Sequence, residues 1–397
     1  MLNDPIVITG LARTPMGAFQ GELSSLTAPQ LGATAIREAV YRSGVQPADI
    51  HEVIMGCVLP AGQGQAPARQ ASIAAGLPLS AGCTTINKMC GSAMKAAMLA
   101  HDLLAAGTND FMVAGGMESM TNAPYLLPKA RGGMRMGHGV VLDHMFYDGL
   151  EDAYDKGRLM GTFAEECATQ FKFTREAQDA FAIESLERAQ AANDDGTFDW
   201  EIAPVTIPGR KSPGDDRIMK RDEQPFKAAI DKIPGLKPAF AKDGTVTAAN
   251  SSSISDGAAA LVMMRRSTAE RRGIKPIAVV IGHATHAQEP NLFTTAPVGA
   301  IRKLYDKTGW STKDVDLFEV NEAFAVVTMA AMREHDIAHH RMNVHGGACA
   351  LGHPIGASGA RILVTLIGAL KKRGLKRGVA ALCIGGGEAT AMGIELV

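Results

Sequence analysis

The stretch PIVITGLART at residues 5–14 recurs near the other end of the chain as PIAVVIGHAT at residues 276–285. Three further pairs of similar segments keep the same order along the chain: 44–58 with 309–323, 84–104 with 341–370, and 110–119 with 378–389. One or two such pairs could arise by chance between Gly- and Ala-rich segments, but four ordered pairs indicate an internal repeat. The sequence therefore predicts two similar halves.

Each copy of the repeat alternates short β-branched strands with longer helical patterns. The predicted strands are Ile6–Thr9, Val53–Met55 and Phe111–Val113 in the first copy, and Val279–Ile281, Leu317–Val320 and Ala380–Ile384 in the second. The clearest helix runs from Ser92 to Ala106 and stops at Gly107. Continuous apolar strands between helices indicate a sheet covered on both faces. We therefore expect an α/β protein made of two layered halves.

Residues 121–249 have no counterpart in the repeat. They hold a Met- and Gly-rich loop at 131–139, an amphipathic helical run that opens at Thr174, and a Pro- and Lys-rich stretch at 204–238. We interpret them as a loop-rich subdomain inserted into the first half. The predicted domains are 1–120 plus about 250–272, the insertion at 121–249, and 273–397.

Composition places the chain among ordinary globular proteins. Its 397 residues are 46% hydrophobic and 20% charged, and the net charge of −1 gives no reason to expect a nucleic-acid partner. No stretch resembles a secretory signal or reaches membrane-spanning length, so we expect no membrane partner. The six cysteines form no C-x-x-C pair, which is typical of reduced thiols. We therefore expect a cytoplasmic protein.

Four residues of chemical interest each follow a predicted strand: Cys90, Asn321, His353 and Cys383. Ligands of layered α/β folds bind beyond the carboxyl ends of strands, and two packed halves would bring these four loops into one cleft. The helix that begins after Cys90 is expected to lower the pKa of its thiol, because unpaired N–H groups at a helix N-terminus favour the thiolate. His353 would complete a nucleophile and base pair with Cys90.

The second thiol separates two reaction classes. A Cys–His acyl hydrolase needs one cysteine, so it leaves Cys383 and the repeat unexplained. A reaction that joins two thioesters needs two thiols, because one carries the acyl group while the other removes a proton at carbon. The Gly-rich segments at 345–359 and 383–389 can supply backbone N–H groups to the resulting enolate oxygen. We therefore favour carbon–carbon bond formation.

A histidine cluster near the end of a predicted helix invites a metal interpretation. His335 and His339 stand four residues apart, with His340 beside them. The glutamate of an H-E-x-x-H motif is absent, and charged clusters at helix ends are usually solvated, so we expect no metal. Neither Gly-rich segment forms a complete phosphate-binding motif after a strand.

Several long segments resemble the thiolase family, in its acetyl-CoA acetyltransferase branch. The segments are NKMCGSAMKA, NEAFA, GGACALGHPIGASGARI, CIGGGEATAM, GMESMTNAPYLLP, MGTFAEECA and TVTAANSSSISDGAAA. The resemblance runs from about residue 5 to the C-terminus, through the insertion as well. It implies the thiolase fold, in which two repeated α/β halves form αβαβα layers and carry an inserted loop subdomain.

The resemblance also implies roles for individual residues. Cys90 would accept the acetyl group, and His353 would activate Cys90 and later help to hold a thioester oxygen. Cys383 would take the α-proton in synthesis and return it in cleavage. Asn321 would fix the water that joins His353 in one oxyanion hole, while the backbone N–H groups of Cys90 and Gly385 would form the other.

Further residues would line the path of the substrate. The resemblance implies such contacts for Ser252, Ala248, Ala323, Phe324, Met160, Leu150 and Phe293. Two of the positions concerned with the acyl group depart from the family pattern. Leu159 replaces a histidine of many biosynthetic relatives, and Phe293 stands where methionine is common. The preferred acyl chain therefore stays open.

The nucleotide end of coenzyme A meets a third departure. Pro225 and Phe226 fall where an arginine usually contacts the nucleotide. Lys227 or Arg221 would take the place of that arginine.

The implied activity is that of an acetyl-CoA C-acetyltransferase of fatty acid metabolism. Two acetyl-CoA molecules would give acetoacetyl-CoA and CoA, or the reverse, by a ping-pong route through acetyl-Cys90. CoA thioesters would be the substrates, with no separate cofactor and no metal. The alternative is a broader 3-ketoacyl-CoA thiolase of β-oxidation or of amino-acid or aromatic catabolism. A decarboxylating ketoacyl synthase would need a second histidine in place of Asn321.

The expected assembly is a homotetramer, a dimer of dimers. Family members are dimers or tetramers, and the unmatched insertion at 121–249 is the natural tetramerisation element.

Overall fold

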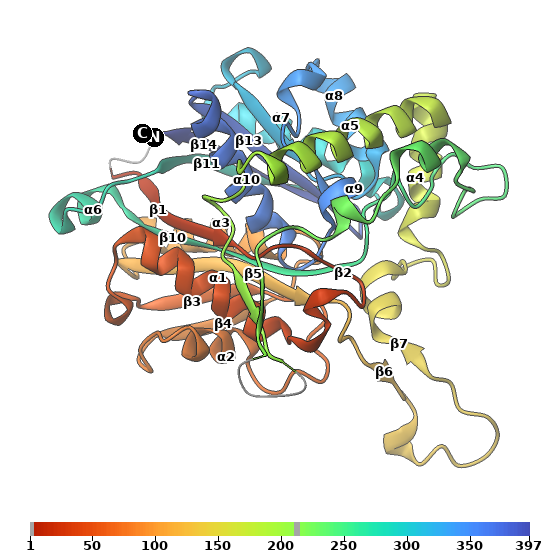
Figure 1. Cartoon of the computed structure of the whole chain (residues 1–397), viewed down its shortest axis with the longest axis horizontal. Helices are drawn as coiled ribbons and strands as arrows, with labels where there is room; N and C mark the ends of the chain where they lie inside the picture. The colour runs from red at the N-terminus through yellow and green to blue at the C-terminus, as the bar shows by residue number, and fades with distance from the viewer. Residues whose placement is uncertain (1–3, 210–214) are drawn as a thin grey trace.

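The computed structural model describes residues 4–209 and 215–397. A long mixed sheet runs through the molecule, with helices on its outer faces and between its two parts (Figure 1). Within the described ranges, no helix is both long and apolar enough to cross a bilayer.

Ten strands form one hydrogen-bonded sheet with two parts. The N-terminal part runs in the order β1 (Ile6–Arg13), β10 (Ser255–Arg265), β5 (Phe111–Ser119), β3 (Glu52–Gly56) and β4 (Gly82–Ile86), with β2 (Gly17–Ala18) beside β10. The C-terminal part runs in the order β11 (Ala278–Ala287), β14 (Glu388–Leu396), β13 (Arg377–Ile384) and β12 (Leu317–Val320). The two parts meet at β1 and β11 through the residue pairs Val7 with Val279 and Ile8 with Ala278.

The two parts of the sheet have the same topology. In each, the first strand is antiparallel to the second, the second is antiparallel to the third, and the third is parallel to the fourth. The segments 5–14 and 276–285 of the sequence repeat contain most of β1 and β11. The register also slips within both of these strands, between Ile8 and Gly10 and between Val280 and Gly282. The predicted α/β fold with two repeated halves is confirmed.

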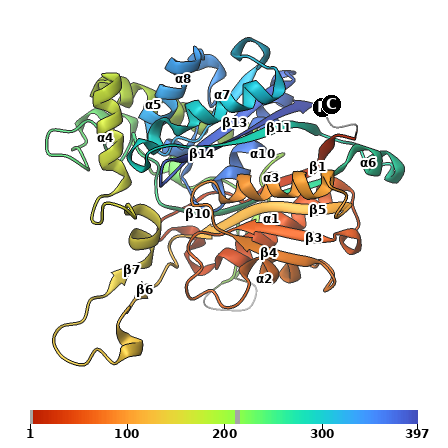
Figure 2. The same ribbon diagram turned by 180° about the vertical axis from the view of Figure 1, so that it is seen from behind.

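Helices form three layers around and between the two parts of the sheet (Figures 1 and 2). The outer layer on the N-terminal part holds α1 (Ala28–Ser43) and α2 (Pro67–Ala74), the middle layer holds α3 (Ser92–Ala105) and α10 (Ser358–Arg373), and the outer layer on the C-terminal part holds α7 (Ala296–Thr308) and α8 (Ala325–His335). Three large apolar clusters fill the spaces between these layers. The order of layers is therefore αβαβα.

Small residues allow the middle layer to pack tightly. A Cβ on Gly359 of α10 would lie 2.4 Å from the backbone nitrogen of Met94 in α3. A Cβ on Gly116 of β5 would lie 2.0 Å from the carbonyl oxygen of Gly356, in the loop before α10. Real Cβ atoms do not approach so closely, so glycine is required at both contacts. These contacts place the loop before α10 directly over the end of β5.

The insertion between β5 and β10 covers one end of the sheet. It contains the hairpin β6 (Tyr125–Leu126) and β7 (Leu142–Asp143), the π-helical turn η4 (Phe146–Leu150), α4 (Met160–Phe171), α5 (Arg175–Asp194), β8 (Val205–Ile207) and β9 (Arg217–Met219). The hairpin ends in an arm that projects from the body (Figure 1). The predicted helix start is confirmed, because Thr174 Oγ1 accepts the N–H of Ala177 at 3.2 Å and caps α5.

Sequence analysis missed β10 and β14 and misplaced one histidine. The two strands are rich in Ala and Gly, which have low strand propensity, yet β10 is buried along nearly its whole length and β14 in its middle. Their position between layers of helices explains the small side chains.

The prediction that one helix carries both His335 and His339 was wrong. α8 ends at His335 because Asp336 adopts a φ of 51°, and His339 begins the separate 3-10 turn η9 (His339–Arg341).

Candidate active site

One cavity of about 430 Å³ collects nearly all the residues that the sequence singled out. Of the predicted reactive groups, Cys90, His353, Cys383 and Gly385 line it. The predicted substrate contacts also line it: Ser252, Ala248, Ala323, Phe324, Met160, Leu150 and Phe293. Asn321 lies behind this wall, where its Nδ2 is 3.4 Å from His353 Nδ1. Four separate loops therefore converge on one apolar chamber.

Cys90 lies in a tight turn immediately before α3. Met89 adopts a φ of 46°, in the left-handed region, and its N–H is held by Asn87 Oδ1 at 2.8 Å. Burial raises the pKa of the Cys90 thiol to about 11, although the backbone N–H groups of Gly385 and Cys90 itself donate to the sulfur and lower it. The expected lowering by the helix N-terminus is therefore wrong for the resting site. The thiol is protonated at neutral pH and needs a base.

His353 supplies a neutral imidazole to the chamber that Cys90 lines. Ser358 Oγ donates its proton to the carbonyl of Pro354 at 2.9 Å, so it accepts a hydrogen bond from His353 Nδ1 at 2.6 Å. This assignment leaves the lone pair on Nε2. Burial lowers the pKa of His353 to about 3, with a further lowering by the charge of Arg361. The ring is therefore neutral and can accept a proton.

Two buried polar atoms near His353 have no hydrogen-bond partner among the described residues. They are His353 Nε2 and Asn321 Oδ1. Buried polar atoms are paired in the great majority of cases, so such exceptions often mark the place of a ligand or an ordered water. The pair fits the role implied for an oxyanion hole that uses His353 and a water held by Asn321.

Cys383 is a second buried thiol at the end of β13. Burial raises the pKa of its thiol well above the usual value, and the negative charge of a Cys90 thiolate raises it further. The two thiols therefore lie close enough for the charge of one to act on the other. After Cys383 the chain turns sharply, with a φ of 92° at Gly386 and 84° at Gly387, and returns as β14. This turn places Gly385 against the chamber.

Glu118 holds together two loops next to the site, and sequence analysis did not single it out. Its fully buried carboxylate accepts N–H groups from Val58 at 2.9 Å, Leu59 at 3.1 Å and Gly356 at 2.8 Å. Burial raises the pKa of Glu118 to about 7, against the lowering by these hydrogen bonds. One side chain thus ties the loop that carries His353 to a loop of the N-terminal half. An acidic residue at the end of a fully buried strand was the available signal.

The channel wall joins two of the predicted motifs. The N–H of Ser252 donates to the carbonyl of Ala323 at 2.9 Å, and Ser251 forms a β-bridge with Phe324. The ring of Phe324 meets that of Phe240 edge-on, with centroids 6.0 Å apart. These contacts form the apolar side of the chamber.

The two cations suggested for the nucleotide end of coenzyme A are already engaged. Lys227 pairs with Glu223 at 2.5 Å. Arg221 pairs with Asp194, and its guanidinium carbon stacks 3.4 Å from the ring centroid of Phe226. Either side chain would have to leave an ion pair before it could bind a phosphate.

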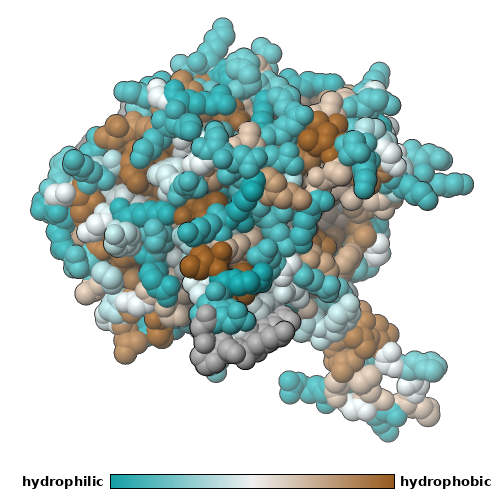
Figure 3. Space-filling view, viewed as in Figure 1, coloured by the Kyte–Doolittle hydropathy of each residue, from teal (hydrophilic) through white to brown (hydrophobic). Residues whose placement is uncertain are grey.

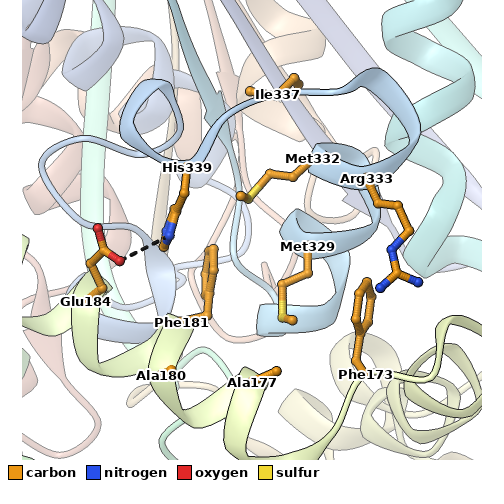
Figure 4. Close-up of a pocket in the computed structure, with 10 residues that line it drawn as sticks. All are labelled: Phe173, Ala177, Ala180, Phe181, Glu184, Met329, Met332, Arg333, Ile337 and His339. Carbon is orange, nitrogen blue, oxygen red and sulfur yellow. Dashed lines mark ion pairs between the residues drawn. The ribbon is translucent and has the colours of Figure 1, made fainter.

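The histidines of the α8 region lie away from the chamber and from one another. Figure 4 shows His339 in a different cavity, between α5 and α8, where it pairs with Glu184 at 3.1 Å. Its ring stacks on that of Phe181 with centroids 5.0 Å apart. His335 Nε2 instead contacts the carbonyl oxygen of Val298 at 3.0 Å. These residues do not form a metal site together.

Comparisons with known proteins agree along the whole chain. Residues 6–267 match the family described as "Thiolase, N-terminal domain", and residues 274–396 match "Thiolase, C-terminal domain". Acetyl-CoA acetyltransferase 2 of Arabidopsis thaliana is 50% identical over 99% of this chain and 97% of its own length. Acetyl-CoA acetyltransferase of Cupriavidus necator is 48% identical over 98% of this chain and 99% of its own length.

Two solved structures share the fold. The Acat5 thiolase of Ascaris suum, in complex with coenzyme A, has a TM-score of 0.93 at 42% identity, over 99% of this chain and 100% of its own. The acetyl-CoA acetyltransferase of Bacillus anthracis has a TM-score of 0.96 at 40% identity, over 99% of both chains. The fold class predicted from the sequence is therefore confirmed.

The hydrogen bonds of Glu118 predict the effect of removing its charge. Glu118→Gln replaces one acceptor oxygen by an NH₂ group, so at least one buried backbone N–H loses its partner. The free energy of unfolding should fall by about 1–3 kcal/mol, measured by urea denaturation. Glu334→Gln, on an exposed stretch of α8, is the matched control and should change it by less than about 0.5 kcal/mol. Equal unfolding curves for the two variants would contradict the stabilising role of Glu118.

Proposed function

The chain belongs to the thiolase family, and we propose that it makes and cleaves acetoacetyl-CoA through an acetyl group carried on Cys90. It is an acyltransferase, an acetyl-CoA C-acetyltransferase that uses CoA thioesters as substrates. The observation that carries the proposed route is the shared chamber of two thiols, one neutral imidazole and two inward-facing backbone N–H groups. A hydrolase would use one of these thiols and leave the other idle.

The first half-reaction transfers acetyl to the enzyme. As the sulfur of Cys90 attacks the thioester carbonyl, its proton passes to Nε2 of His353, which carries the free lone pair. The carbon–sulfur bond to CoA breaks, and the departing CoA sulfur takes its proton from the thiol of Cys383, which becomes a thiolate. The proton from Cys90 stays on Nε2 of His353. The N–H groups of Cys90 and Gly385, which bond the resting sulfur, are placed to hold the carbonyl oxygen as its charge develops.

The second half-reaction needs a base at carbon. Once Cys90 carries an acetyl group it can no longer ionise, so no Cys90 thiolate opposes the thiolate of Cys383. The Cys383 thiolate then takes an α-proton from the second acetyl-CoA. His353 and a water held by Asn321 stabilise the enolate oxygen, and the enolate carbon attacks acetyl-Cys90. Acetoacetyl-CoA forms, and the released Cys90 thiolate takes its proton back from His353.

The proposed compartment is the cytoplasm. All six cysteines are free, including the half-buried Cys83 and Cys349, as suits a reducing environment. A place in fatty acid metabolism follows from the substrates, in either direction of the reaction.

We also propose a homotetramer built as a dimer of dimers. The arm formed by β6, β7 and the loop that joins them exposes a run of apolar residues: Tyr125, Leu127, Met136, Val140 and Val141. Figure 3 shows hydrophobic surface on this arm, away from the body of the molecule. A projecting arm cannot bury these side chains within its own chain, so a second dimer is the natural partner.

Cys90 should carry the acetyl group. Brief incubation with acetyl-CoA, followed by denaturation and peptide mass analysis, is expected to show acetyl on the peptide that contains Cys90. Cys90→Ser should abolish turnover, because an alcohol is a far poorer nucleophile than a thiolate at neutral pH. Cys83→Ser, which alters another free thiol, is the control and should retain activity. A label found on Cys383 alone, or on neither thiol, would contradict the assignment.

Cys383→Ala should separate the two half-reactions. Acetyl transfer to Cys90 and exchange with free CoA are expected to survive in part. Condensation and deuterium exchange at the α-carbon of acetyl-CoA should fall by roughly 10²–10⁴-fold, the usual contribution of a general base. His353→Ala should impair both half-reactions. If Cys383→Ala retained α-exchange near the wild-type rate, the two-thiol route would be wrong.

Light scattering tests the assembly. The intact protein should have about four times the chain mass of 41.7 kDa at micromolar concentration. Deletion of residues 128–140 should give a dimer, because it removes the tip of the arm while it leaves the body unchanged. A monomer or dimer mass for the intact protein would contradict the tetramer.

A further inference from the structure

Three potential metal ligands meet far along α3 from Cys90. His101 and Asp102 lie near the C-terminal end of α3, the helix that the N-terminal half contributes to the middle layer. His283 lies in β11, a strand of the C-terminal half. Together they line a surface cavity of about 670 Å³ that shares no residue with the chamber of Cys90. Among the residues that the structure describes, this is the one group of three or more such ligands close enough to hold an ion.

The ligand atoms form a compact triangle. His101 Nδ1 is 3.0 Å from Asp102 Oδ1, His283 Nε2 is 2.9 Å from the same oxygen, and the two nitrogens are 3.3 Å apart. The two rings are nearly perpendicular, at 87°, with centroids 4.9 Å apart. Tetrahedral ligands about 2.0–2.1 Å from a zinc ion lie roughly 3.3–3.4 Å from one another. The triangle therefore fits three corners of a tetrahedron with little movement.

The protonation states of Asp102 and His283 suit a cation. Burial acts to raise the pKa of Asp102, but hydrogen bonds from His101 and His283 hold it below the usual value, so the group is a carboxylate. Burial lowers the pKa of His283, against the raising effect of Asp102, so its imidazole is neutral near pH 7. A carboxylate oxygen and neutral imidazole nitrogens are the forms that bind metals.

Charged residues surround the three ligands, and one side of the group is open to solvent. Lys307 Nζ donates to the backbone carbonyl of His283 at 3.0 Å, and Arg266 lines the same cavity. Glu395, also in the lining, pairs with Arg377 at 2.6 Å. The carboxylate of Asp102 is about half exposed, whereas both histidine side chains are mostly buried. A fourth position would therefore be taken by water from the open cavity.

We propose that His101, Asp102 and His283 bind one divalent transition-metal ion of the zinc type, which clamps α3 of one half to β11 of the other. Without an ion, both imidazoles can donate to the same carboxylate oxygen, but their two N–H groups then face each other at 3.3 Å. An ion replaces that conflict with three ligand bonds. The site lies outside the catalytic chamber, so its role is to hold the halves together, and it is independent of the proposed reaction.

The test uses full-length, tag-free protein that has been treated with a chelator and dialysed. Calorimetric titration with zinc chloride should show one ion per chain, and zinc should raise the melting temperature. Asp102→Asn and His283→Gln should each weaken binding at least about tenfold and reduce the thermal shift. His340→Gln, at an exposed histidine outside the cluster, is the matched control and should bind as the wild type does.

Cobalt identifies the ligands. Bound Co²⁺ should give the visible spectrum of a tetrahedral site without a sulfur-to-cobalt charge-transfer band. If the spectrum shows a sulfur-to-cobalt band, and this band persists in both cluster variants, the ion is bound by thiols and the proposal is wrong. Equal zinc affinity in the wild type and in both variants, or no saturable binding, would overturn it as well. Catalytic turnover should be unchanged in Asp102→Asn, because this residue does not touch the chamber.

Discussion

The contact between α3 and α10 fixes where the chemistry can occur. Cys90 ends the turn that leads into α3, and His353 lies in the loop that leads into α10. Because Gly359 allows α10 to meet the backbone of α3 at Met94, the starts of the two helices come together from opposite halves. The third reactive group, Cys383, arrives on the strand that packs against the same helix layer. The site is thus a consequence of helix packing in the middle of the molecule.

Burial sets the protonation states of the reactive groups in this site. The resting chamber holds neutral thiols and a neutral imidazole, because a charge in an apolar space without a partner is expensive. Charge therefore appears there only as a proton moves between neighbours or as bonds form. The backbone N–H groups at Cys90 are fixed by the turns around them, and they meet a developing charge without reorganisation. The same burial explains why a helix N-terminus alone does not activate the thiol.

Sequence analysis predicted the duplicated α/β fold and the family, and eleven of its predicted site residues line the chamber. The fold and the residues Cys90, His353 and Cys383 followed from strand patterns, repeats and positions after strands. The other chamber residues came from the resemblance to the family. It missed β10 and β14, whose small residues are selected by packing between layers rather than by strand propensity. It also missed Glu118, whose partners at Val58 and Gly356 are distant in the sequence. The cluster of His101, Asp102 and His283 likewise depends on contact between the halves.

The matching register slips of β1 and β11 have a historical consequence. An irregularity shared by two halves at corresponding positions is inherited more easily than invented twice, so both halves descend from one ancestral unit. Two identical copies of that unit, joined about a twofold axis, would have offered a symmetric cleft with the same side chains on either side. In the present chain the first half supplies the nucleophile Cys90, and the second half supplies His353 and Cys383. The chamber is therefore chemically asymmetric, although the architecture around it is repeated.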